Sequence, residues 1–225
     1  MERRYDRQIL LPEIGEEGQR KLARARVLLV GCGGLGAPIA TYLTAAGVGT
    51  LGLMDDDKVS LTNMQRQVLF TEGQVGLGKV ACAALRLRQL NSEVAIREYP
   101  CRLALDNADT NISEYDIVVD GTDNAASRYL ISDVCQRLGK PYVYGSICGL
   151  EGQVAVLCKG RATYRTLFPD APLNTDKHVV GVTPAVVGSV EASQVIQLIC
   201  GYGESLVDRL WTIDLRTMQS FIINL

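Results

Sequence analysis

Residues 27–57 constrain the fold more than any other stretch, because they join a strand, a glycine turn, a helix and a second strand. The apolar, β-branched run at 27–30 is typical of a buried parallel strand. The turn at 31–36 follows at once and fits the pattern G-x-G-x-x-G, and a helix is predicted over 37–46. A second strand is predicted over 50–54, and it ends on three consecutive aspartates.

Each glycine of this turn has its own expected task. Gly31 allows the tight turn, Gly33 lets backbone N–H groups approach a phosphate, and Gly36 lets helix and strand pack closely. The helix N-terminus adds partial positive charge, and Asp55, 19 residues beyond Gly36, can accept hydrogen bonds from ribose hydroxyls. The stretch therefore predicts a nucleotide-binding unit, with a tight turn that binds no ligand as the alternative. It leaves open which nucleotide binds.

Length and composition indicate one α/β domain of ordinary globular character. The chain has 225 residues, of which 47% are hydrophobic and 21% are charged. Its 23 basic and 25 acidic side chains give a net charge of −2, so no overall charge attracts it to nucleic acid or to a membrane surface. The first residues are too polar for a signal peptide, and no apolar run approaches transmembrane length. We therefore expect a cytoplasmic protein with neither nucleic acid nor membrane as a partner.

Strands and helices alternate as far as residue 146, which predicts a Rossmann-like, doubly wound α/β sheet that is mostly parallel. The later strands follow short turns, so the C-terminal strands are predicted to be antiparallel. Residues 159–180 lack periodicity and are predicted to form a long functional loop. The predicted helices cover residues 16–25, 37–46, 79–90, 103–112, 124–138 and 183–200. The predicted strands cover residues 27–30, 50–54, 94–99, 116–120, 142–146, 150–158, 211–215 and 219–225.

The seven cysteines form no C-x-x-C pair and are expected to be reduced and mostly buried. Cys32 is the exception, because it lies in the glycine turn near a helix N-terminus, where the pKa of a thiol tends to fall. The only histidine, His178, lies in the long loop and is predicted to be solvent-exposed rather than a catalytic base.

Candidate chemistry gathers beyond the carboxyl ends of the predicted parallel strands, where open α/β sheets bind their ligands. That edge is expected to hold the glycine turn, the aspartates at 55–57, the segment 63–66 with Lys79, and Asp123. Together they would supply an anion cradle, ribose acceptors, two cations and a carboxylate suited to Mg²⁺. Hydride transfer needs little more than the first two. The extra cations and the acid favour a triphosphate, a metal, and phosphoryl or nucleotidyl chemistry.

Two further features refine this expectation. Asp123 stands before the helix predicted at 124–138 and could cap it. The pattern G-x-x-x-x-G-K-[ST] is missing, so the chain is not a P-loop NTPase. No serine, cysteine or histidine stands out as a nucleophile. The nucleophile is therefore expected to come from the substrate, with catalysis by positioning and charge stabilisation.

Motifs along almost the whole chain carry a family resemblance. In order they are RYDRQILLPEIGEEGQRKL, VLLVGCGGLGAPIATYLTAAGVG, LMDDDKVSLTNMQRQ, VGLGKV, VVDGTDN, GQVAV and GSVEASQVIQ. The chain resembles the ubiquitin-activating-type adenylyltransferases of bacterial sulfur transfer, the ThiF, MoeB and HesA family. Family members use MgATP to adenylate the C-terminal glycine of a small ubiquitin-fold sulfur-carrier protein ending in Gly-Gly, and they release pyrophosphate. The acyl adenylate then becomes a thiocarboxylate for thiamine or molybdopterin synthesis.

The resemblance also implies an architecture and a site. It implies a single E1-like adenylation domain over residues 1–225, a crossover loop at about 159–180, and a homodimer across which Arg7 reaches the partner's site. Asp55 would bind the ribose and Asp123 would hold Mg²⁺. The implied catalytic residues are Arg66, Lys79, Asp123 and Arg7. The implied nucleotide-binding residues are Gly31, Gly33, Gly34, Gly36, Asp55, Asp57, Thr62, Asn63, Gln65, Arg66, Lys79, Asp123 and Asn124.

Two departures from the family pattern carry expectations of their own. Many relatives bind a structural zinc through two C-x-x-C pairs, but the corresponding segment here runs from Thr163 to Thr166 and no second pair follows, so we predict no zinc. Where some relatives place a cysteine in the crossover loop, this chain has Asp176, so covalent sulfur chemistry on the loop is not expected. Without a zinc anchor, the loop is predicted to become ordered when a carrier tail binds beneath it.

Three alternative functions stay open at this point. The chain could adenylate another peptide C-terminus or a tRNA, although it has no basic patch for tRNA. It could be a nucleotide-binding scaffold without turnover. An NAD-dependent dehydrogenase is also conceivable from the glycine turn, but it would leave Arg66 and Lys79 without a task.

Overall fold

Within residues 4–172 and 178–225, which the computed structural model describes, the chain forms one eight-stranded sheet in the order β3-β2-β1-β4-β5-β6-β7-β8. Neighbouring strands from β3 to β5 run parallel, and β5 to β8 pair antiparallel, as predicted. The strands are β1 (Arg26–Val30), β2 (Thr50–Met54), β3 (Ala95–Tyr99), β4 (Ile117–Asp120), β5 (Tyr142–Cys148), β6 (Glu151–Leu157), β7 (Arg209–Asp214) and β8 (Gln219–Asn224). This mixed sheet confirms the predicted fold class.

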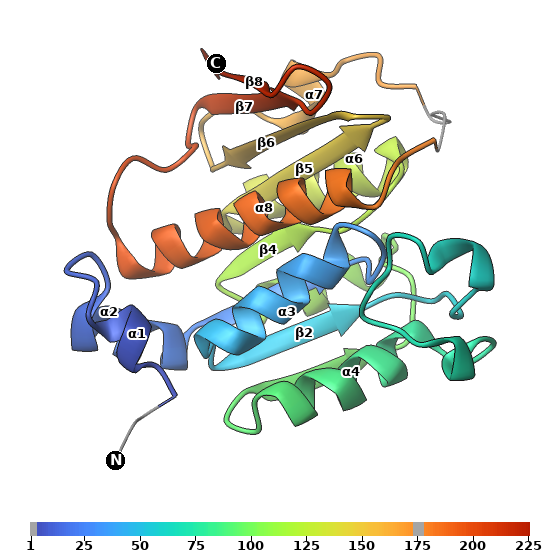
Figure 1. Cartoon of the computed structure of the whole chain (residues 1–225). Coiled ribbons are helices and arrows are strands. Elements are labelled where there is room, and N and C mark those ends of the chain that lie inside the picture. Colours follow the sequence, from blue (N-terminus) through green and yellow to red (C-terminus); the bar gives the residue numbers. More distant parts are fainter. Residues whose placement is uncertain (1–3, 173–177) are drawn as a thin grey trace.

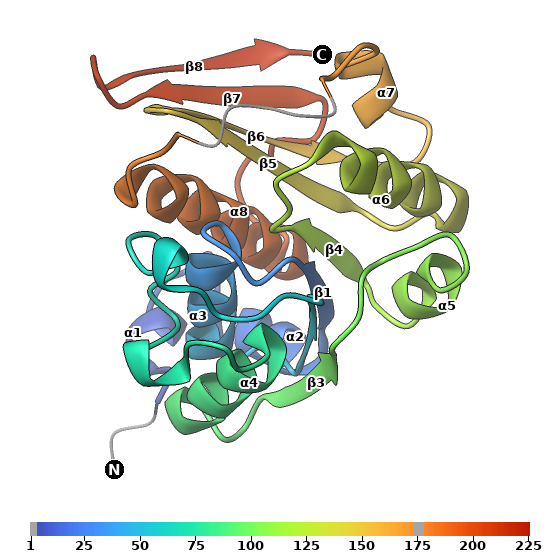
Figure 2. The same ribbon diagram turned by 90° about the vertical axis from the view of Figure 1, so that its right-hand side faces the viewer.

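Helices cover both faces of the sheet (Figures 1 and 2). One face carries α2, α3, α4 and α8, and the other carries α5, α6 and α7. The helices are α1 (Asp6–Ile9), α2 (Gly15–Arg24), α3 (Gly36–Ala46), α4 (Lys79–Leu90), α5 (Ala108–Ser113), α6 (Ala125–Leu138), α7 (Tyr164–Leu167) and α8 (Val182–Cys200). Two short 3₁₀ helices, η1 (Leu61–Asn63) and η2 (Glu72–Gln74), lie between β2 and α4.

The apolar run of β1 explains why the sheet is covered on both sides. Its side chains alternate, so that Val27 and Leu29 join the core beneath α3 and α8, while Leu28 and Val30 join the core beneath α5 and α6. A strand buried on both faces needs a continuous apolar sequence, and this is typical of a central parallel strand.

The glycine turn packs directly on the turn that follows β4. Gly31 has φ +95°, and a Cβ there would lie 2.5 Å from the carbonyl oxygen of Gly121. A Cβ on Gly36 would lie 2.2 Å from the carbonyl oxygen of Gly31. These distances exclude any side chain, so the close packing predicted for Gly36 and the tight turn predicted for Gly31 are both present.

Two local predictions are wrong, and in each an asparagine explains why. The helix predicted at 103–112 begins only at Ala108, because the Asn107 side chain accepts from the Ala104 N–H (3.0 Å) and donates to the Arg102 carbonyl (2.9 Å). Helix α6 is capped by Asn124 rather than by Asp123. The Asn124 Oδ1 accepts from the Ser127 N–H at 2.9 Å.

The expectation that no apolar run approaches transmembrane length also needs correction. Helix α8 has 19 residues and is apolar enough to cross a membrane by length and composition. In this fold it packs along α3, β5 and β6, and it buries Thr183, Val187 and Glu191 against them. That packing is typical of a core helix.

Candidate functional site

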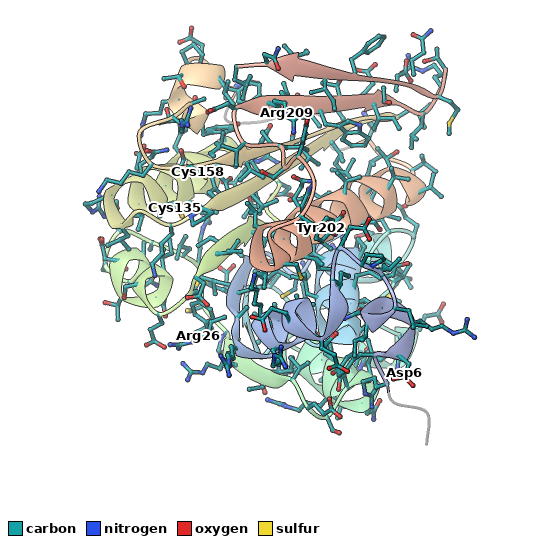
Figure 3. The ribbon with its side chains drawn as sticks, turned by 90° about the vertical axis from the view of Figure 1, so that its left-hand side faces the viewer. Asp6, Arg26, Cys135, Cys158, Tyr202 and Arg209 are labelled. Atoms are coloured by element: carbon teal, nitrogen blue, oxygen red, sulfur yellow. The ribbon has the colours of Figure 1, made fainter. Side chains whose placement is uncertain are left out.

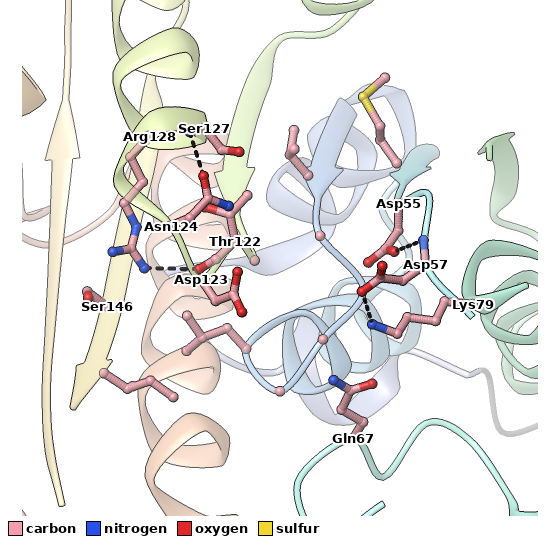
Figure 4. A pocket seen from close by; sticks show the side chains of 18 of the residues that line it. Asp55, Asp57, Gln67, Lys79, Thr122, Asp123, Asn124, Ser127, Arg128 and Ser146 are labelled. Atoms are coloured by element: carbon pink, nitrogen blue, oxygen red, sulfur yellow. Dashed lines mark hydrogen bonds and ion pairs between the residues drawn. The ribbon is translucent and has the colours of Figure 1, made fainter. Parts of the chain in front are cut away.

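A cavity of about 520 Å³ lies beyond the carboxyl ends of β1, β2, β4 and β5 (Figure 4). It brings together nine of the residues selected from the sequence: Gly31, Gly33, Gly34, Asp55, Asp57, Arg66, Lys79, Asp123 and Asn124. Gly36, Thr62, Asn63 and Gln65 lie beside it without lining it, and Arg7 is exposed on α1, outside the cavity. The sheet edge therefore concentrates the predicted chemistry in one place.

Asp55 and Asp57, which follow β2, have different partners. Asp55 is half-buried, and its carboxylate accepts from the Cys32 N–H and from the Asp57 N–H, both at 2.8 Å. It therefore braces the glycine turn while still facing the cavity. Asp57 is exposed and pairs with the Lys79 ammonium at 2.8 Å.

Lys79 is a buried cation at the first turn of α4. Only 4% of the residue is exposed, whereas the side chain of its partner Asp57 is 69% exposed. A buried ammonium needs an anion or acceptors close by. Lys79 is therefore held at the cavity wall by one solvent-facing carboxylate, where an incoming anion can compete for it.

Arg66 lines the cavity and packs against the glycine turn. A Cβ on Gly34 would lie 3.4 Å from its Cγ and Cδ, so the absence of a side chain there leaves room for the arginine. Its Nη1 donates to the Thr62 carbonyl at 3.3 Å. The predicted residue Gln65 donates to the carbonyl of Val179, a residue of the cavity wall, at 3.4 Å.

The turn after β4 is held from two sides by buried groups that the sequence analysis missed. Asp120 accepts from the Thr122 N–H (2.8 Å) and hydroxyl (2.6 Å), and also from Arg128 Nε at 3.2 Å. Arg128 in turn donates from Nη2 to the Thr122 carbonyl at 2.9 Å. The pair fixes the turn that presents Asp123, and Figure 4 shows the bond from Arg128 to this turn. The available signal was an acid closing a buried strand, with an arginine eight residues later on the helix that follows.

Cys32 corrects an expectation about the thiols. It is almost fully buried, so burial raises the pKa of its thiol, and the nearby Asp55 charge raises it further. The predicted lowering by the helix N-terminus is therefore wrong. Four of the seven cysteines are buried, and all seven are free thiols. Figure 3 shows Cys135 on α6 and Cys158 just beyond β6.

A second cavity of about 380 Å³ adjoins the first and runs over the antiparallel strands. The two share Ser146, Ile147 and Cys148 at the end of β5. The outer cavity extends across β6 and β7 to Phe221 on the edge strand β8. Phe221, Ile222 and Ile223 are each more than half exposed. The outer cavity therefore adjoins the first at the end of β5 and reaches the apolar edge strand at Phe221.

The long loop is only partly described. Thr163 caps the short helix α7 in a capping box with Thr166. His178 is exposed, as predicted, and also lines the first cavity, where its carbonyl accepts from the Gly149 N–H at 3.0 Å. Asp176 lies outside the described residues. The loop's response to a carrier tail, and the absence of zinc, stay predictions.

Glu191 of α8 is fully buried against Gly145 of β5, and within the described residues neither carboxyl oxygen has a hydrogen-bond partner. Burial and the nearby Asp120 charge raise the pKa of this carboxyl well above its ordinary 4.5. The folded protein therefore holds a proton that the unfolded chain releases as the pH rises. Stability should fall with pH above about 4.5 for this reason, by at most about 1.4 kcal/mol per pH unit.

The Glu191→Gln variant removes this titration, so its stability advantage over the wild type should grow steadily from pH 5 to pH 8. Urea unfolding at each pH measures the difference. Glu72→Gln, on an exposed acid, is the control and should keep a constant difference. Parallel pH profiles for wild type and Glu191→Gln would contradict the expectation.

Comparison with known proteins extends over nearly the whole chain. The family model described as the ThiF family matches residues 5–225. The Zea mays "Adenylyltransferase and sulfurtransferase MOCS3-1" is 44% identical over 229 residues, which cover 99% of this chain and 49% of that protein. The Thermus thermophilus "Sulfur carrier protein adenylyltransferase" is 44% identical over 223 residues, which cover 94% of this chain and 82% of that protein. This chain thus spans about half the length of the maize relative.

A solved structure shares the fold of this chain. The Escherichia coli protein MccB, crystallised with ATP, superimposes with a TM-score of 0.85 at 25% identity, covering 100% of this chain and 72% of that one.

Proposed function

This chain belongs to the ThiF family, and from that premise we propose that it is an ATP-dependent adenylyltransferase acting on the C-terminal glycine carboxylate of a small ubiquitin-like sulfur-carrier protein. The observation that carries the proposal is the single cavity holding the glycine turn, Arg66, Lys79 and Asp123. The printed names of the maize and Thermus relatives, and the ATP in the MccB crystal, support it.

The proposed reaction is an in-line displacement at the α-phosphorus of ATP. A carboxylate oxygen of the carrier forms the new P–O bond, the bond between the α-phosphorus and the bridging oxygen breaks, and pyrophosphate leaves with the electron pair. Arg66 and Lys79 would hold the phosphates, and Asp55 would accept from the ribose hydroxyls. Phosphate would compete with Asp57 for the Lys79 ammonium.

Mg²⁺ fits the donors on the cavity wall. The Asp123 carboxylate is exposed there, and Mg²⁺ binds through one or two carboxylates together with phosphate oxygens. Bound there, the metal would neutralise charge on the leaving pyrophosphate. The chain's own part is to hold the turn still, through Asp120 and Arg128.

The carrier is proposed to reach this cavity through its outer neighbour. An extended C-terminal tail would lie over β6 and β7, and its carboxylate would enter past Ser146 and Cys148. The apolar edge at β8 would receive the carrier's folded part.

The proposal also includes the domain organisation, the oligomeric state and the pathway. We propose one adenylation domain, a cytoplasmic homodimer in which Arg7 of one copy completes the site of the other, and a role in thiamine or molybdopterin synthesis. The exposure of Arg7 on α1 is compatible with such a contact.

The test is ATP–pyrophosphate exchange with a ubiquitin-fold carrier ending in Gly-Gly. Exchange should require the carrier, and it should vanish when the carrier's C-terminal carboxylate is replaced by a carboxamide, because the nucleophile is then lost. A chain that binds ATP yet exchanges with no Gly-Gly carrier would overturn the proposal and favour a nucleotide-binding scaffold.

A further inference from the structure

One face of α6 carries four polar side chains to which the proposed reaction assigns no task. They are Tyr129, Ser132, Asp133 and Gln136, and their spacing of i, i+3, i+4 and i+7 places them on the same side of the helix. These four residues form the anchor face of α6. The anchor face holds residues 158–171, the first part of the long loop, and α7 within that part lies beside α6 (Figure 2).

Gln136 and Ser132 hold the beginning of this segment. Gln136 Nε2 donates to the Cys158 carbonyl at 2.7 Å, and its Oε1 accepts from the Gly160 N–H at 3.2 Å. Ser132 is 1% exposed, and its hydroxyl accepts from the Tyr164 N–H at 3.0 Å. Side chains of α6 therefore pair with backbone groups just beyond β6 and at the start of α7, where regular structure leaves such groups unpaired.

Tyr129 and Asp133 hold the rest of the segment. The Tyr129 hydroxyl donates to the Phe168 carbonyl at 2.5 Å and accepts from the Ala171 N–H at 3.2 Å. Arg165 donates to the Asp133 carboxylate from Nε at 2.9 Å and from Nη2 at 2.7 Å, and its guanidinium lies 4.7 Å from the centre of the Tyr129 ring. The ion pair is partly exposed and contributes little by itself, whereas the hydroxyl fixes the backbone directly.

The other end of the same loop belongs to the first cavity. His178 and Val179 line the cavity wall that the carrier's carboxylate is proposed to pass. Each residue that becomes ordered only on binding costs conformational entropy, and residues that are already held cost none. Anchoring residues 158–171 in advance therefore favours binding of a carrier at the far end of the loop.

We propose that the anchor face of α6 fixes residues 158–171 before any carrier binds, and that Tyr129 is a positioning residue that lowers the entropic cost of carrier binding. The role in carrier binding rests on the proposed function, whereas the anchoring itself does not. On this basis, the ordering predicted for the loop when a carrier binds does not include residues 158–171.

Trypsin digestion of the full chain, without nucleotide or carrier, tests the anchoring, because Lys159 and Arg165 are exposed within the held segment. Tyr129→Phe keeps the ring and removes only the hydroxyl, so cleavage after Arg165 should become about five- to tenfold faster. Gln136→Met should accelerate cleavage after Lys159 in the same way. Cleavage after Arg216, between β7 and β8, is the internal control, and mass spectrometry assigns each site.

Carrier-dependent ATP–pyrophosphate exchange tests the positioning role. Tyr129→Phe should raise the KM for the carrier about tenfold. The maximal exchange rate and the affinity for ATP should stay at their wild-type values, because Tyr129 lines neither cavity. Tyr42→Phe, which removes an exposed hydroxyl from α3, is the matched control and should change neither the cleavage rates nor the KM. Thermal unfolding of each variant shows that the fold is intact.

Equal cleavage after Arg165 in the wild type and Tyr129→Phe would overturn the anchoring. Faster cleavage with an unchanged KM would overturn the positioning role, as would a lower maximal rate in place of a higher KM. The proposed function fails by a different result, namely a wild-type chain that binds ATP without carrier-dependent exchange, and the trypsin digestion then still decides the anchoring.

Discussion

We expect Asp123→Ala to lower carrier-dependent ATP–pyrophosphate exchange by about a hundred- to a thousandfold, which is typical for removing one charged group from a phosphoryl-transfer site. Its carboxylate faces the cavity from the turn after β4. The fold should tolerate the change, because Asn124 rather than Asp123 caps α6. Initial exchange rates at saturating ATP and carrier measure the effect.

The matched control is Asp106→Ala, which removes an exposed acid outside the cavity and should exchange at the wild-type rate. Raising the Mg²⁺ concentration should partly restore exchange in Asp123→Ala, because the remaining phosphate ligands still bind the metal. Wild-type exchange in Asp123→Ala at low Mg²⁺ would remove Asp123 from the proposed metal site.

The second large effect is on stability. Arg128→Met leaves the Asp120 carboxylate buried without its ion-pair partner, and it should lower the free energy of unfolding by about 3–5 kcal/mol. Tyr142 and Thr122 still donate to Asp120, but neither carries a positive charge. Adding Asp120→Asn should recover part of the loss, because the unpaired charge is then gone. Urea unfolding measures both variants.

Arg137→Met is the control on the same helix, because Arg137 pairs with Asp109 in the open. Their side chains are 57% and 52% exposed, so this change should cost no more than about 1 kcal/mol. Similar losses of unfolding free energy in the two arginine variants would show that the buried Asp120–Arg128 pair contributes no more to stability than an exposed pair.

The sequence was sufficient wherever a pattern acts locally. The burial of the apolar run in β1 and the close packing at Gly31 and Gly36 depend on neighbouring residues, and these predictions agree with the structure. The short turn between β5 and β6 likewise made antiparallel pairing predictable. The shared strand ends then explain why nine selected residues meet in one cavity.

Where the sequence misled, the deciding contacts come from distant segments. The pKa of the Cys32 thiol rises because the surrounding fold buries it, which outweighs its place near a helix N-terminus. Glu191 is buried without a partner by β5, which no helical periodicity could reveal.

The close contact between Gly31 and Gly121 lowers the free-energy cost of ordering the two turns when a ligand binds. The glycine turn at 31–36 and the turn with Asp123 lie in close backbone contact at Gly31 and Gly121, so a shift of one turn displaces the other. The spacing between the proposed phosphate-binding turn and the carboxylate proposed to hold Mg²⁺ is thus fixed before any ligand binds. In the proposed reaction, ordering these two loops would therefore use little of the binding free energy of ATP, and more of it would remain to align the α-phosphorus with the entering carboxylate.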